Sequence, residues 1–308
     1  MVFAPGVRLT VTVERPADEA ELHVHAGGQG VWQARMVALL GGEATLCTTL
    51  GGETGRVLAT LLESEDFGVR AVHLAETSGW YVHDRRDGER DEIASHPGAP
   101  LDRHHVDELY TAALAEGLRT TVSVLGGPVD PAQIPADAYR RLAADLTTNG
   151  AELVVDLLGE HLDAVLPAGV ALAKVSHDEL VETGRARDDS PASLARVAGE
   201  LHDAGASAVL VTRADEPAIA LIDEEYYLVS VPPMEEADFR GAGDSLVGAV
   251  AAMLAQGADL PTAVRTGAAA GAANVTRHGL GTGHADVIME LARRVTLDRW
   301  SSFDRRSS

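Results

Sequence analysis

The sequence is poor in residues that would place it in several other classes of protein. Cys47 is the only cysteine among 308 residues, so the chain can form no internal disulfide, and a reducing compartment suits it. Aromatic residues make up only 4% of the chain, whereas alanine and glycine are abundant. This composition favours close packing of helices on a sheet over an aromatic-rich β-sandwich.

Long apolar runs and basic residues are also scarce. No stretch is long enough to span a bilayer, and the N-terminus lacks the basic and then apolar layout of a signal peptide. The chain has 25 lysines and arginines against 47 aspartates and glutamates, a formal net charge of -22 that would repel a nucleic-acid backbone. We therefore expect a soluble cytoplasmic protein that binds neither nucleic acid nor membrane.

A repeated order of loop, helix and strand runs through most of the chain. Two glycine-rich turns, at 26–30 and 51–55, each open a predicted helix. Further strands are predicted at 44–50, 121–125, 153–157, 171–175 and 208–212, with a hairpin at 218–222 and 226–231. Further helices are predicted at 102–116, 135–148, 177–184, 191–204, 244–256 and 261–276. This alternation indicates a mainly parallel α/β sheet.

Two pairs of short strands interrupt this order. Residues 8–14 and 21–25 alternate polar and apolar side chains, and residues 80–84 and 92–94 resemble them. Together they predict a small sheet outside the main one, built from about 8–25 and 78–96. We expect one domain over residues 1–308, with residues 296–308 as a polar tail that frays.

The segment Asp238-Phe-Arg-Gly-Ala-Gly-Asp-Ser245 carries the clearest chemistry. A helix rich in small residues follows it, so the N–H groups of Gly241, Ala242 and Gly243 would lie at a helix N-terminus, where they could bind an anion such as phosphate. Asp244 would then be a carboxylate placed to take a proton from a hydroxyl group. Together these groups suit phosphoryl transfer to an alcohol. A plain turn with a capping aspartate would show the same pattern.

Several motifs together resemble the ribokinase-like carbohydrate kinases. The similarity is greatest to the phosphofructokinase B type, the branch that includes 1-phosphofructokinase and tagatose-6-phosphate kinase. The motifs, in order, are Ala26-Gly-Gly-Gln-Gly30, Leu50-Gly-Gly-Glu-Thr-Gly55, Pro97-Gly-Ala-Pro-Leu101, Val155-Asp-Leu-Leu-Gly-Glu160, Lys174-Val-Ser-His-Asp-Glu-Leu180 and the segment from Asp238 to Ser245. The resemblance implies a Rossmann-like three-layer αβα sandwich with a small β-sheet lid.

The resemblance also implies a reaction and roles for particular residues. It implies phosphorylation of a small-molecule alcohol by ATP with Mg²⁺, and a homodimer joined through the lid. Asp244 would be the general base, Gly241 to Gly243 would hold the phosphoryl group, and Glu179 would organise the metal through water. The implied nucleotide-binding residues are Lys174, Thr212, Arg213, Arg240 and Asn274. The implied substrate-binding residues are Arg8, Gly27, Gly28, Gln29 and Trp32.

The substrate positions depart from the family pattern. Arg8 stands where an aspartate holds sugar hydroxyls, and Trp32 replaces an asparagine. Gln29 replaces a lysine or glycine, and Ser78 replaces an arginine that often contacts the substrate's phosphate. These changes predict an acceptor unlike fructose 1- or 6-phosphate. Trp32 would form a stacking wall, Arg8 would pair with an anionic group, and a nucleoside or another less hydroxylated alcohol would suit the site.

The nucleotide positions depart as well. Residues 212–217 lack both glycines of the family motif, and Asp215 and Glu216 add negative charge. Arg240 can offset that charge or be an ordinary surface arginine. An active kinase and a catalytically weak relative that binds a ligand or regulates a partner are therefore both open. A nicotinamide-dependent enzyme is poorly supported, because the turn at 28–33 lacks the third glycine. We favour the kinase.

Overall fold

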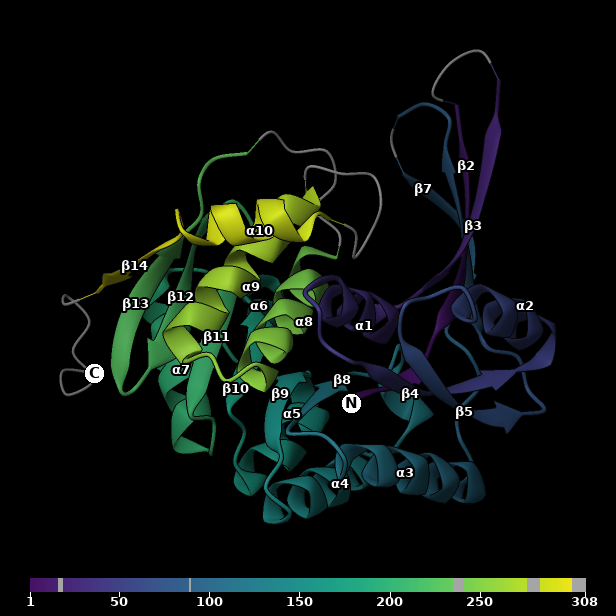
Figure 1. Cartoon of the computed structure of the whole chain (residues 1–308), viewed down its shortest axis with the longest axis horizontal. Helices are drawn as coiled ribbons and strands as arrows, with labels where there is room; N and C mark the ends of the chain where they lie inside the picture. Colours follow the sequence, from purple (N-terminus) through teal and green to yellow (C-terminus); the bar gives the residue numbers. More distant parts are fainter. Residues whose placement is uncertain (16–18, 89, 235–240, 276–282, 301–308) are drawn as a thin grey trace.

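The computed structural model describes residues 1–15, 19–88, 90–234, 241–275 and 283–300. The main sheet has the strand order β14-β13-β12-β11-β10-β9-β8-β1-β4-β5 (Figure 1). All neighbours from β11 to β5 are parallel, whereas β12, β13 and β14 add antiparallel strands at one edge. The strands are β1 (Val2–Gly6), β4 (Thr45–Gly51), β5 (Gly68–Leu74), β8 (Val122–Gly126), β9 (Glu152–Asp156), β10 (Leu172–Ser176), β11 (Ala208–Arg213), β12 (Glu216–Ile222), β13 (Glu225–Ser230) and β14 (Thr296–Arg299).

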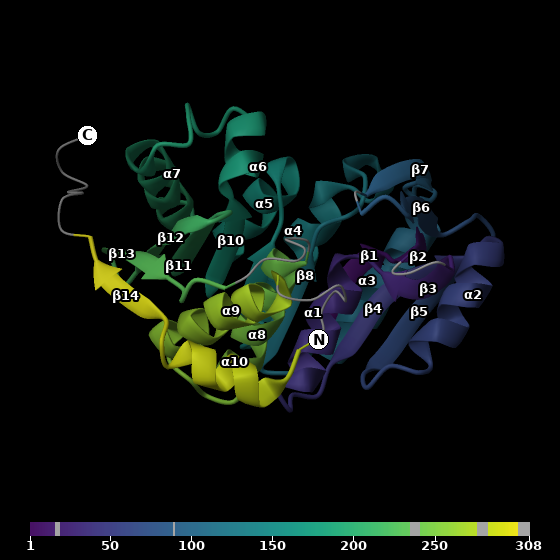
Figure 2. The same cartoon turned by 90° about the horizontal axis from the view of Figure 1, so that it is seen from above.

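Helices cover both faces of this sheet (Figure 2). One face carries α1 (Gln29–Leu39), α2 (Gly52–Leu62), α8 (Ala242–Ala255), α9 (Leu260–Val275) and α10 (Ala285–Ala292). The other face carries α3 (Arg103–Gly117), α4 (Ala136–Thr148), α5 (Gly159–Val165), α6 (His177–Glu182) and α7 (Pro191–Asp203). There are also two short 3-10 helices, η1 (Pro131–Gln133) and η2 (Leu166–Ala168). Within β9, Val154 belongs to one core while Leu153 and Val155 belong to the other. Consecutive residues of the central strands are apolar because both faces of the sheet are buried. The predicted three-layer αβα architecture is confirmed.

Small residues let α1 approach the sheet and α8 approach α1. A Cβ atom placed on Gly30 would lie 2.3 Å from the Cβ atom of Ala4, and one on Gly248 would lie 2.5 Å from the backbone oxygen of Gln33. Neither position therefore accepts a larger residue without movement of a neighbour. This close packing brings the N-termini of α1 and α8 together at one edge of the sheet.

A second sheet stands apart from the main body (Figure 1). Its strands are β2 (Arg8–Glu14), β3 (Glu21–Gly27), β6 (Gly79–Arg85) and β7 (Asp91–His96), in the order β3-β2-β6-β7. This is the small sheet predicted from residues 8–25 and 78–96, and we refer to it as the lid sheet. Thr10, Thr12 and His83 are buried on it, whereas Leu22 and Ile93 are 67% and 62% exposed.

Several elements were not predicted. The strands β1 and β5 and the helices α5 and α10 were missed. The fraying tail was predicted to begin at residue 296, which is wrong for the first part of that segment. Thr296–Arg299 form β14, where Leu297 pairs with Val229 and packs against the core. Hydrogen bonding along the sheet edge holds this polar segment in place. Within the described residues, no helix is both long and apolar enough to cross a bilayer.

Candidate active site

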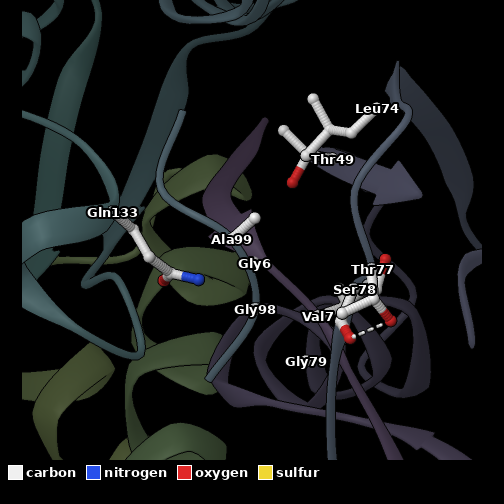
Figure 3. A pocket seen from close by; sticks show the side chains of 10 residues that line it. All are labelled: Gly6, Val7, Thr49, Leu74, Thr77, Ser78, Gly79, Gly98, Ala99 and Gln133. Atoms are coloured by element: carbon white, nitrogen blue, oxygen red, sulfur yellow. Dashed lines mark hydrogen bonds between the residues drawn. The ribbon is translucent and has the colours of Figure 1, made fainter. Parts of the chain in front are cut away.

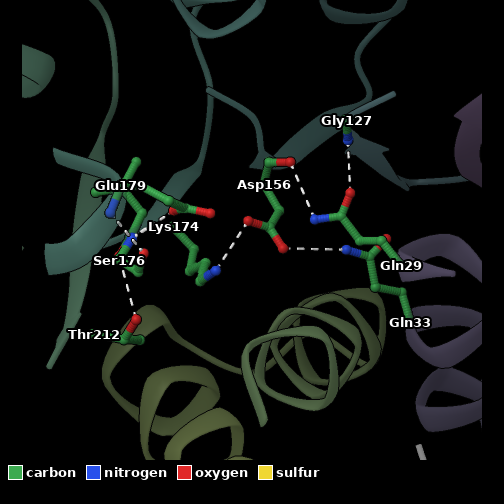
Figure 4. Close-up of polar contacts among 9 residues, drawn as sticks. Gln29, Gln33, Gly127, Asp156, Lys174, Ser176, Glu179 and Thr212 are labelled. Atoms are coloured by element: carbon green, nitrogen blue, oxygen red, sulfur yellow. Dashed lines mark hydrogen bonds and ion pairs between the residues drawn. The ribbon is translucent and has the colours of Figure 1, made fainter. Parts of the chain in front are cut away.

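The predicted site residues gather at the carboxyl ends of the central strands. Along the chain, β4 and β5 are added on one side of β1, and β8, β9, β10 and β11 on the other. The order of strand addition therefore reverses between β1 and β8. Such a reversal opens a crevice beyond the carboxyl ends of the strands, which is where α/β proteins bind their ligands. Asp156 at the end of β9 and Lys174 in β10 lie at this edge (Figure 4).

The N-terminus of α8 lies where the sequence predicted a helix to begin. Gly241 has a φ of 74°, in the left-handed region that glycine adopts without strain, and α8 begins at Ala242. The N–H group of Ser245 donates to the Gly241 carbonyl oxygen at 2.8 Å, the first bond of the helix. The N–H groups of Ala242, Gly243 and Asp244 precede that bond and have no intrahelical partner. They suit an anion, and the phosphate-binding role predicted for Gly241, Ala242 and Gly243 stays a prediction.

Lys174 brings a buried positive charge to this helix end. A Cβ atom on Gly243 would lie 2.9 Å from Lys174 Nζ, so the ammonium group lies directly against the first turn of α8. Nζ also donates to Asp156 Oδ1 at 3.1 Å. Burial lowers the pKa of Lys174, but the carboxylates of Asp156, Glu179 and Asp244 outweigh it and leave the pKa above its ordinary value. The side chain is therefore charged at neutral pH.

Asp244 has the pKa expected of a group that exchanges protons near neutral pH. Burial is the largest cause that raises its pKa, the carboxylates of Asp156 and Glu179 raise it further, and Lys174 and Arg8 lower it. The result is a pKa of about 8, against an ordinary 3.8. Acid–base catalysis is most efficient when the catalytic pKa lies close to the working pH. The environment of Asp244 therefore suits the predicted role of general base.

Asp156 joins Lys174 to the N-terminal part of α1 (Figure 4). Gln33 Nε2 donates to Asp156 Oδ2 at 3.5 Å, and Gln29 Nε2 donates to the Asp156 backbone oxygen at 3.4 Å. Gln29 Oε1 accepts from the Gly127 N–H at 2.7 Å. A Cβ atom on Gly126 would lie 3.0 and 3.2 Å from the two glutamine Oε1 atoms, so a side chain there would crowd both. These bonds tie α1, the loop after β8 and the end of β9 into one polar network.

Glu179 and Thr212 make local contacts beside this network. Glu179 Oε2 accepts from the Ser176 N–H at 2.9 Å, and the Ser176 hydroxyl accepts from the Glu179 N–H at 3.3 Å, a reciprocal cap on α6. Thr212 Oγ1 donates to the Val175 carbonyl oxygen at 3.4 Å. Glu179 is therefore held in a fixed position while its charge acts on Lys174 and Asp244.

The other predicted nucleotide residues are less closely tied to the network. Arg213 Nη1 donates to the Pro217 carbonyl oxygen at 3.3 Å, so this guanidinium folds back on its own hairpin. At the turn, Ala214 has a φ of 40°, a value that favours glycine. Asn274 is buried in α9. Arg240 lies outside the described residues.

The predicted substrate residues lie at the root of the lid sheet and the start of α1. Gly28 has a φ of 105°, which explains the need for glycine immediately before α1. The indole of Trp32 is only 8% exposed and packs mostly within the core, and its role as a stacking wall for the substrate stays a prediction. Arg8 begins β2 and pairs in the ladder with Gly27 on one side and Gly79 on the other.

Ser78 has a structural role in place of the phosphate contact expected at its position in the family. Its hydroxyl is buried and accepts from the Gly51 N–H at 2.9 Å. Beside it is a small cavity of about 10 Å³, room for a single water molecule (Figure 3). Gln133 lines this cavity and donates to the Pro97 carbonyl oxygen at 2.8 Å.

Two residues of the network were missed as site residues. Asp156 was noted only as part of a strand-end motif, and Gln33 was not singled out. A signal for this buried region was present in the sequence, because Lys174 is the only lysine in the chain. A lone lysine among so many arginines points to a place that needs a compact ammonium group. The carboxylate that keeps it charged could then be sought at the end of a neighbouring strand.

These features are those of a phosphotransferase of the sugar-kinase class, and comparison with known proteins agrees. A family model described as pfkB family carbohydrate kinase matches residues 7–286. The chain therefore belongs to the pfkB family of carbohydrate kinases, which implies ATP as the phosphate donor.

Particular relatives are phosphofructokinases. The ATP-dependent 6-phosphofructokinase isozyme 2 of Escherichia coli is 32% identical over 260 residues, covering 82% of each chain. The 1-phosphofructokinase of Bacillus subtilis is 26% identical over 276 residues, covering 89% of each. The crystal structure of Escherichia coli phosphofructokinase-2 in complex with potassium superposes with a TM-score of 0.83 at 26% identity, covering 95% of this chain and 97% of that one. The predicted family and ribokinase-like fold are confirmed.

Proposed function

We propose that this carbohydrate kinase transfers the γ-phosphoryl group of ATP to a hydroxyl group of a sugar, sugar phosphate or related small alcohol, with Asp244 as general base. The observation that carries the proposal is the position of Asp244. It lies in the first turn of α8, beside unpaired N–H groups and within the electrostatic influence of Lys174, and its pKa is raised to about 8. A base, an anion site and a fixed positive charge therefore meet at one helix end.

In this reaction the Asp244 carboxylate takes the proton from the acceptor hydroxyl. The acceptor oxygen forms a bond to the γ-phosphorus, and the bond from that phosphorus to the bridging oxygen breaks, which releases ADP. The N–H groups of Gly241, Ala242 and Gly243 and the ammonium of Lys174 face the negative charge on the phosphoryl oxygens. These groups are held in place before the reaction, so little reorganisation is needed.

The carboxylates present suit Mg²⁺, the second component proposed. Among the described residues there is no group of three or more His, Cys, Asp or Glu side chains that could hold a metal ion by itself. Mg²⁺ is commonly bound by one or two carboxylates together with substrate phosphates and water. Glu179, through water, and Asp156 would supply the protein's share. When bound, the ion neutralises charge on the phosphates.

The test is ATP turnover with magnesium against a panel of sugars, sugar phosphates and nucleosides. We expect ADP formation with one class of acceptor and a loss of at least about 10²-fold in Asp244→Asn, because the amide cannot accept the proton. Ala255→Val, an exposed change at the far end of the same helix, serves as a control and should retain activity. Full activity in Asp244→Asn would show that another group is the base.

A catalytically weak, ligand-binding relative is the second candidate. The observation that favours it is Arg213, whose guanidinium contacts its own hairpin in a segment without the family glycines. This reading predicts no ADP formation with any acceptor of the panel and no thermal shift on addition of ATP. The turnover assay above therefore distinguishes the two.

The proposed homodimer and cytoplasmic location rest on simpler observations. Leu22, Val24 and Ile93 expose apolar side chains on the lid sheet, and exposed apolar clusters mark interaction surfaces. We propose that two lid sheets meet through them. The lone cysteine, which is buried, suits a reducing cytoplasm.

A further inference from the structure

The lid sheet is joined to the main body by four crossings of the chain, and three of them meet at one side chain. The crossings lie between β1 and β2, between β3 and α1, between β5 and β6, and between β7 and α3. A Cβ atom on Gly6, at the first crossing, would lie 3.4 Å from both the nitrogen and the oxygen of the Gln133 carboxamide. One on Gly98, at the last crossing, would lie 2.9 Å from Gln133 Nε2. Gln133 therefore lies where the lid sheet joins the main body.

The carboxamide of Gln133 binds the lid sheet on one side and its own loop on the other. Nε2 donates to the Pro97 carbonyl oxygen at 2.8 Å, directly after β7. A Cβ atom on Gly79, at the start of β6, would lie 2.7 Å from the same oxygen, so this bond reaches the third crossing as well. Oε1 accepts from the N–H groups of Val129 and Asp130 at 2.9 and 3.4 Å. Gln133 is only 6% exposed, so water competes little for these bonds.

A helix cap explains only half of this side chain. Asp130 and Gln133 form a reciprocal cap on the 3-10 helix η1, in which Gln133 Oε1 accepts from the Asp130 N–H and the Asp130 carboxylate accepts from the Ala132 N–H at 2.9 Å. Glutamate serves such caps as well as glutamine does. Glutamine supplies an N–H group in addition, and here that group binds the lid sheet. The cap therefore does not account for the amide.

The two long connections of the lid sheet are attached at different points of the main body. At the crossing from β5 to β6, the Ser78 N–H donates to the Gly51 carbonyl oxygen at 3.0 Å, and the Ser78 hydroxyl accepts from the Gly51 N–H at 2.9 Å. At the return from β7 to α3, Gln133 makes the contacts. Besides its bond to Pro97, its carbonyl oxygen accepts from the Leu101 N–H at 2.8 Å. Ser78 and Gln133 both line the water-sized cavity (Figure 3), so the two attachments lie on either side of it.

The loop that carries Gln133 begins in the polar network of the crevice. The Gly127 N–H donates to Gln29 Oε1 at 2.7 Å and to the Asp156 backbone oxygen at 3.1 Å. One residue separates Gly127 from Val129, whose N–H donates to Gln133 Oε1. This loop therefore has one end in the crevice and the other against the lid sheet.

We propose that Gln133 is a positioning residue, whose hydrogen bond to Pro97 holds the lid sheet at one angle to the crevice. The predicted substrate residues Arg8 and Gly27 lie in strands of this sheet, so its angle sets their distance from Asp244. Loss of the bond leaves the first turn of α8 in place and allows the lid sheet to swing. The effect on the reaction rests on the proposed kinase function, whereas the effect on the lid sheet does not.

The experiment measures the position of the lid sheet directly. Spin labels on Arg86→Cys, at the exposed end of the lid sheet, and on Arg140→Cys, on α4, report the distance between the lid sheet and the main body by electron paramagnetic resonance. Cys47 does not take up the label, because it is buried and burial raises its pKa to about 12. Dilution with unlabelled chain keeps the measured distances within one chain.

Three variants separate the bond to the lid sheet from the cap. Gln133→Glu, measured at pH 8, keeps the acceptor for Val129 and Asp130 but removes the donor to Pro97, and Gln133→Met removes both. Asp130→Ala removes the other half of the cap and is the matched control. We expect the distance distribution to broaden about twofold in both Gln133 variants and to stay unchanged in Asp130→Ala, since only the first two lose the bond to the lid sheet. Where the buried glutamate folds poorly, Gln133→Met and Asp130→Ala still decide.

Kinetics give a second readout. With the acceptor that the panel identifies, both Gln133 variants should raise the acceptor KM about fivefold, because a smaller fraction of the chains has the lid sheet in position. The kcat and the KM for ATP should stay within about twofold, since the base and the helix end are unchanged. A loss of folded protein alone would lower kcat and leave both KM values as they are.

An unchanged distance distribution in the folded Gln133 variants would overturn the inference. Equal broadening in Asp130→Ala, or broadening in Gln133→Met with none in folded Gln133→Glu, would overturn it too, because the effect would then belong to the cap. A broader distribution with an unchanged acceptor KM would contradict the effect on the reaction. Failure of the kinase proposal has a different signature: no acceptor gives ADP, and the distance distributions still decide the role of Gln133.

Discussion

At the scale of one residue, the surroundings of Lys174 explain why this position has a lysine and not an arginine. Every other basic side chain among the 25 lysines and arginines is an arginine. The ammonium group fits between Asp156 and the first turn of α8, where a Cβ atom on Gly243 would already be 2.9 Å away. A planar guanidinium is larger and requires a different arrangement of acceptors.

Removing the positive charge of Lys174 should destabilise the folded protein. Lys174→Met leaves the buried Asp156 carboxylate without its cation, and we expect a loss of about 3 kcal/mol in the free energy of unfolding. Chemical denaturation measures it. The double variant with Asp156→Asn should recover part of that loss, because the unpaired charge is gone. A loss in the double variant equal to the sum of the losses in Lys174→Met and Asp156→Asn would show that the pair is not coupled.

Asp244 should destabilise the folded protein as the pH rises. Its pKa is raised to about 8 in the folded state, above the ordinary 3.8. Between these values the unfolded chain releases a proton that the folded chain retains, so stability falls as pH increases from about 4 to about 8. Below 3.8 both states are protonated, and the effect disappears.

The variant Asp244→Asn, which mimics the protonated form, should therefore be more stable than the natural chain by several kcal/mol at pH 8 and about as stable at pH 4. Thermal unfolding at the two pH values checks this. In the active protein, kcat/KM should rise with pH through about 8, because only the ionised carboxylate accepts a proton. A stabilising effect independent of pH would contradict the shifted pKa.

At the scale of elements, the site depends on how closely α8 lies against α1. Gly248 faces the backbone of Gln33, and the same turn of α1 directs the Gln33 amide toward Asp156. Gln33 therefore takes part both in the packing of α8 against α1 and in the polar network. The reciprocal cap between Ser176 and Glu179 gives α6 a similar double role.

Gly248→Ala should separate these helices. The new Cβ atom would lie 2.5 Å from a backbone oxygen that cannot rotate away, so we expect a loss of about 1–3 kcal/mol in stability and reduced turnover. Ala255→Val on the exposed end of α8 adds volume without this contact. Denaturant midpoints of the two variants should differ clearly, and similar midpoints would show that α1 shifts at little cost.

At the scale of the whole molecule, the lid sheet exposes apolar side chains that packing within one chain leaves uncovered. Most of the main sheet is covered on both faces, but the lid sheet leaves Leu22 and Val24 exposed on β3. A net charge of -22 would oppose association, so any interface must offset that repulsion by burying apolar area.

Leu22→Lys should convert a dimer into monomers, because a charged side chain would be buried at the proposed interface. Sedimentation velocity checks the mass at several protein concentrations. Val57→Lys, at a residue that is 43% exposed on α2, is the matched control and should leave the mass unchanged. A natural chain that sediments as a monomer at all concentrations would contradict the proposed dimer.

Local patterns made much of the fold predictable. The alternating elements predicted the parallel sheet, and the glycines before Asp244 predicted the start of α8, because turns and helix termini depend on neighbouring residues. The tail was less predictable. Residues 296–299 are polar and have no strong pattern, but pairing with β13 makes them a strand.

The sequence by itself determined the family, the order of elements and the chemistry of residues 241–244, since each depends on residues close together in the chain. Only the tertiary structure decided that Trp32 is buried, that Arg8 lies between two glycines, and that Asp156 pairs with Lys174. These relations join segments far apart in sequence, and they depend on strand order, register and the depth at which a helix packs. No local pattern contains that information.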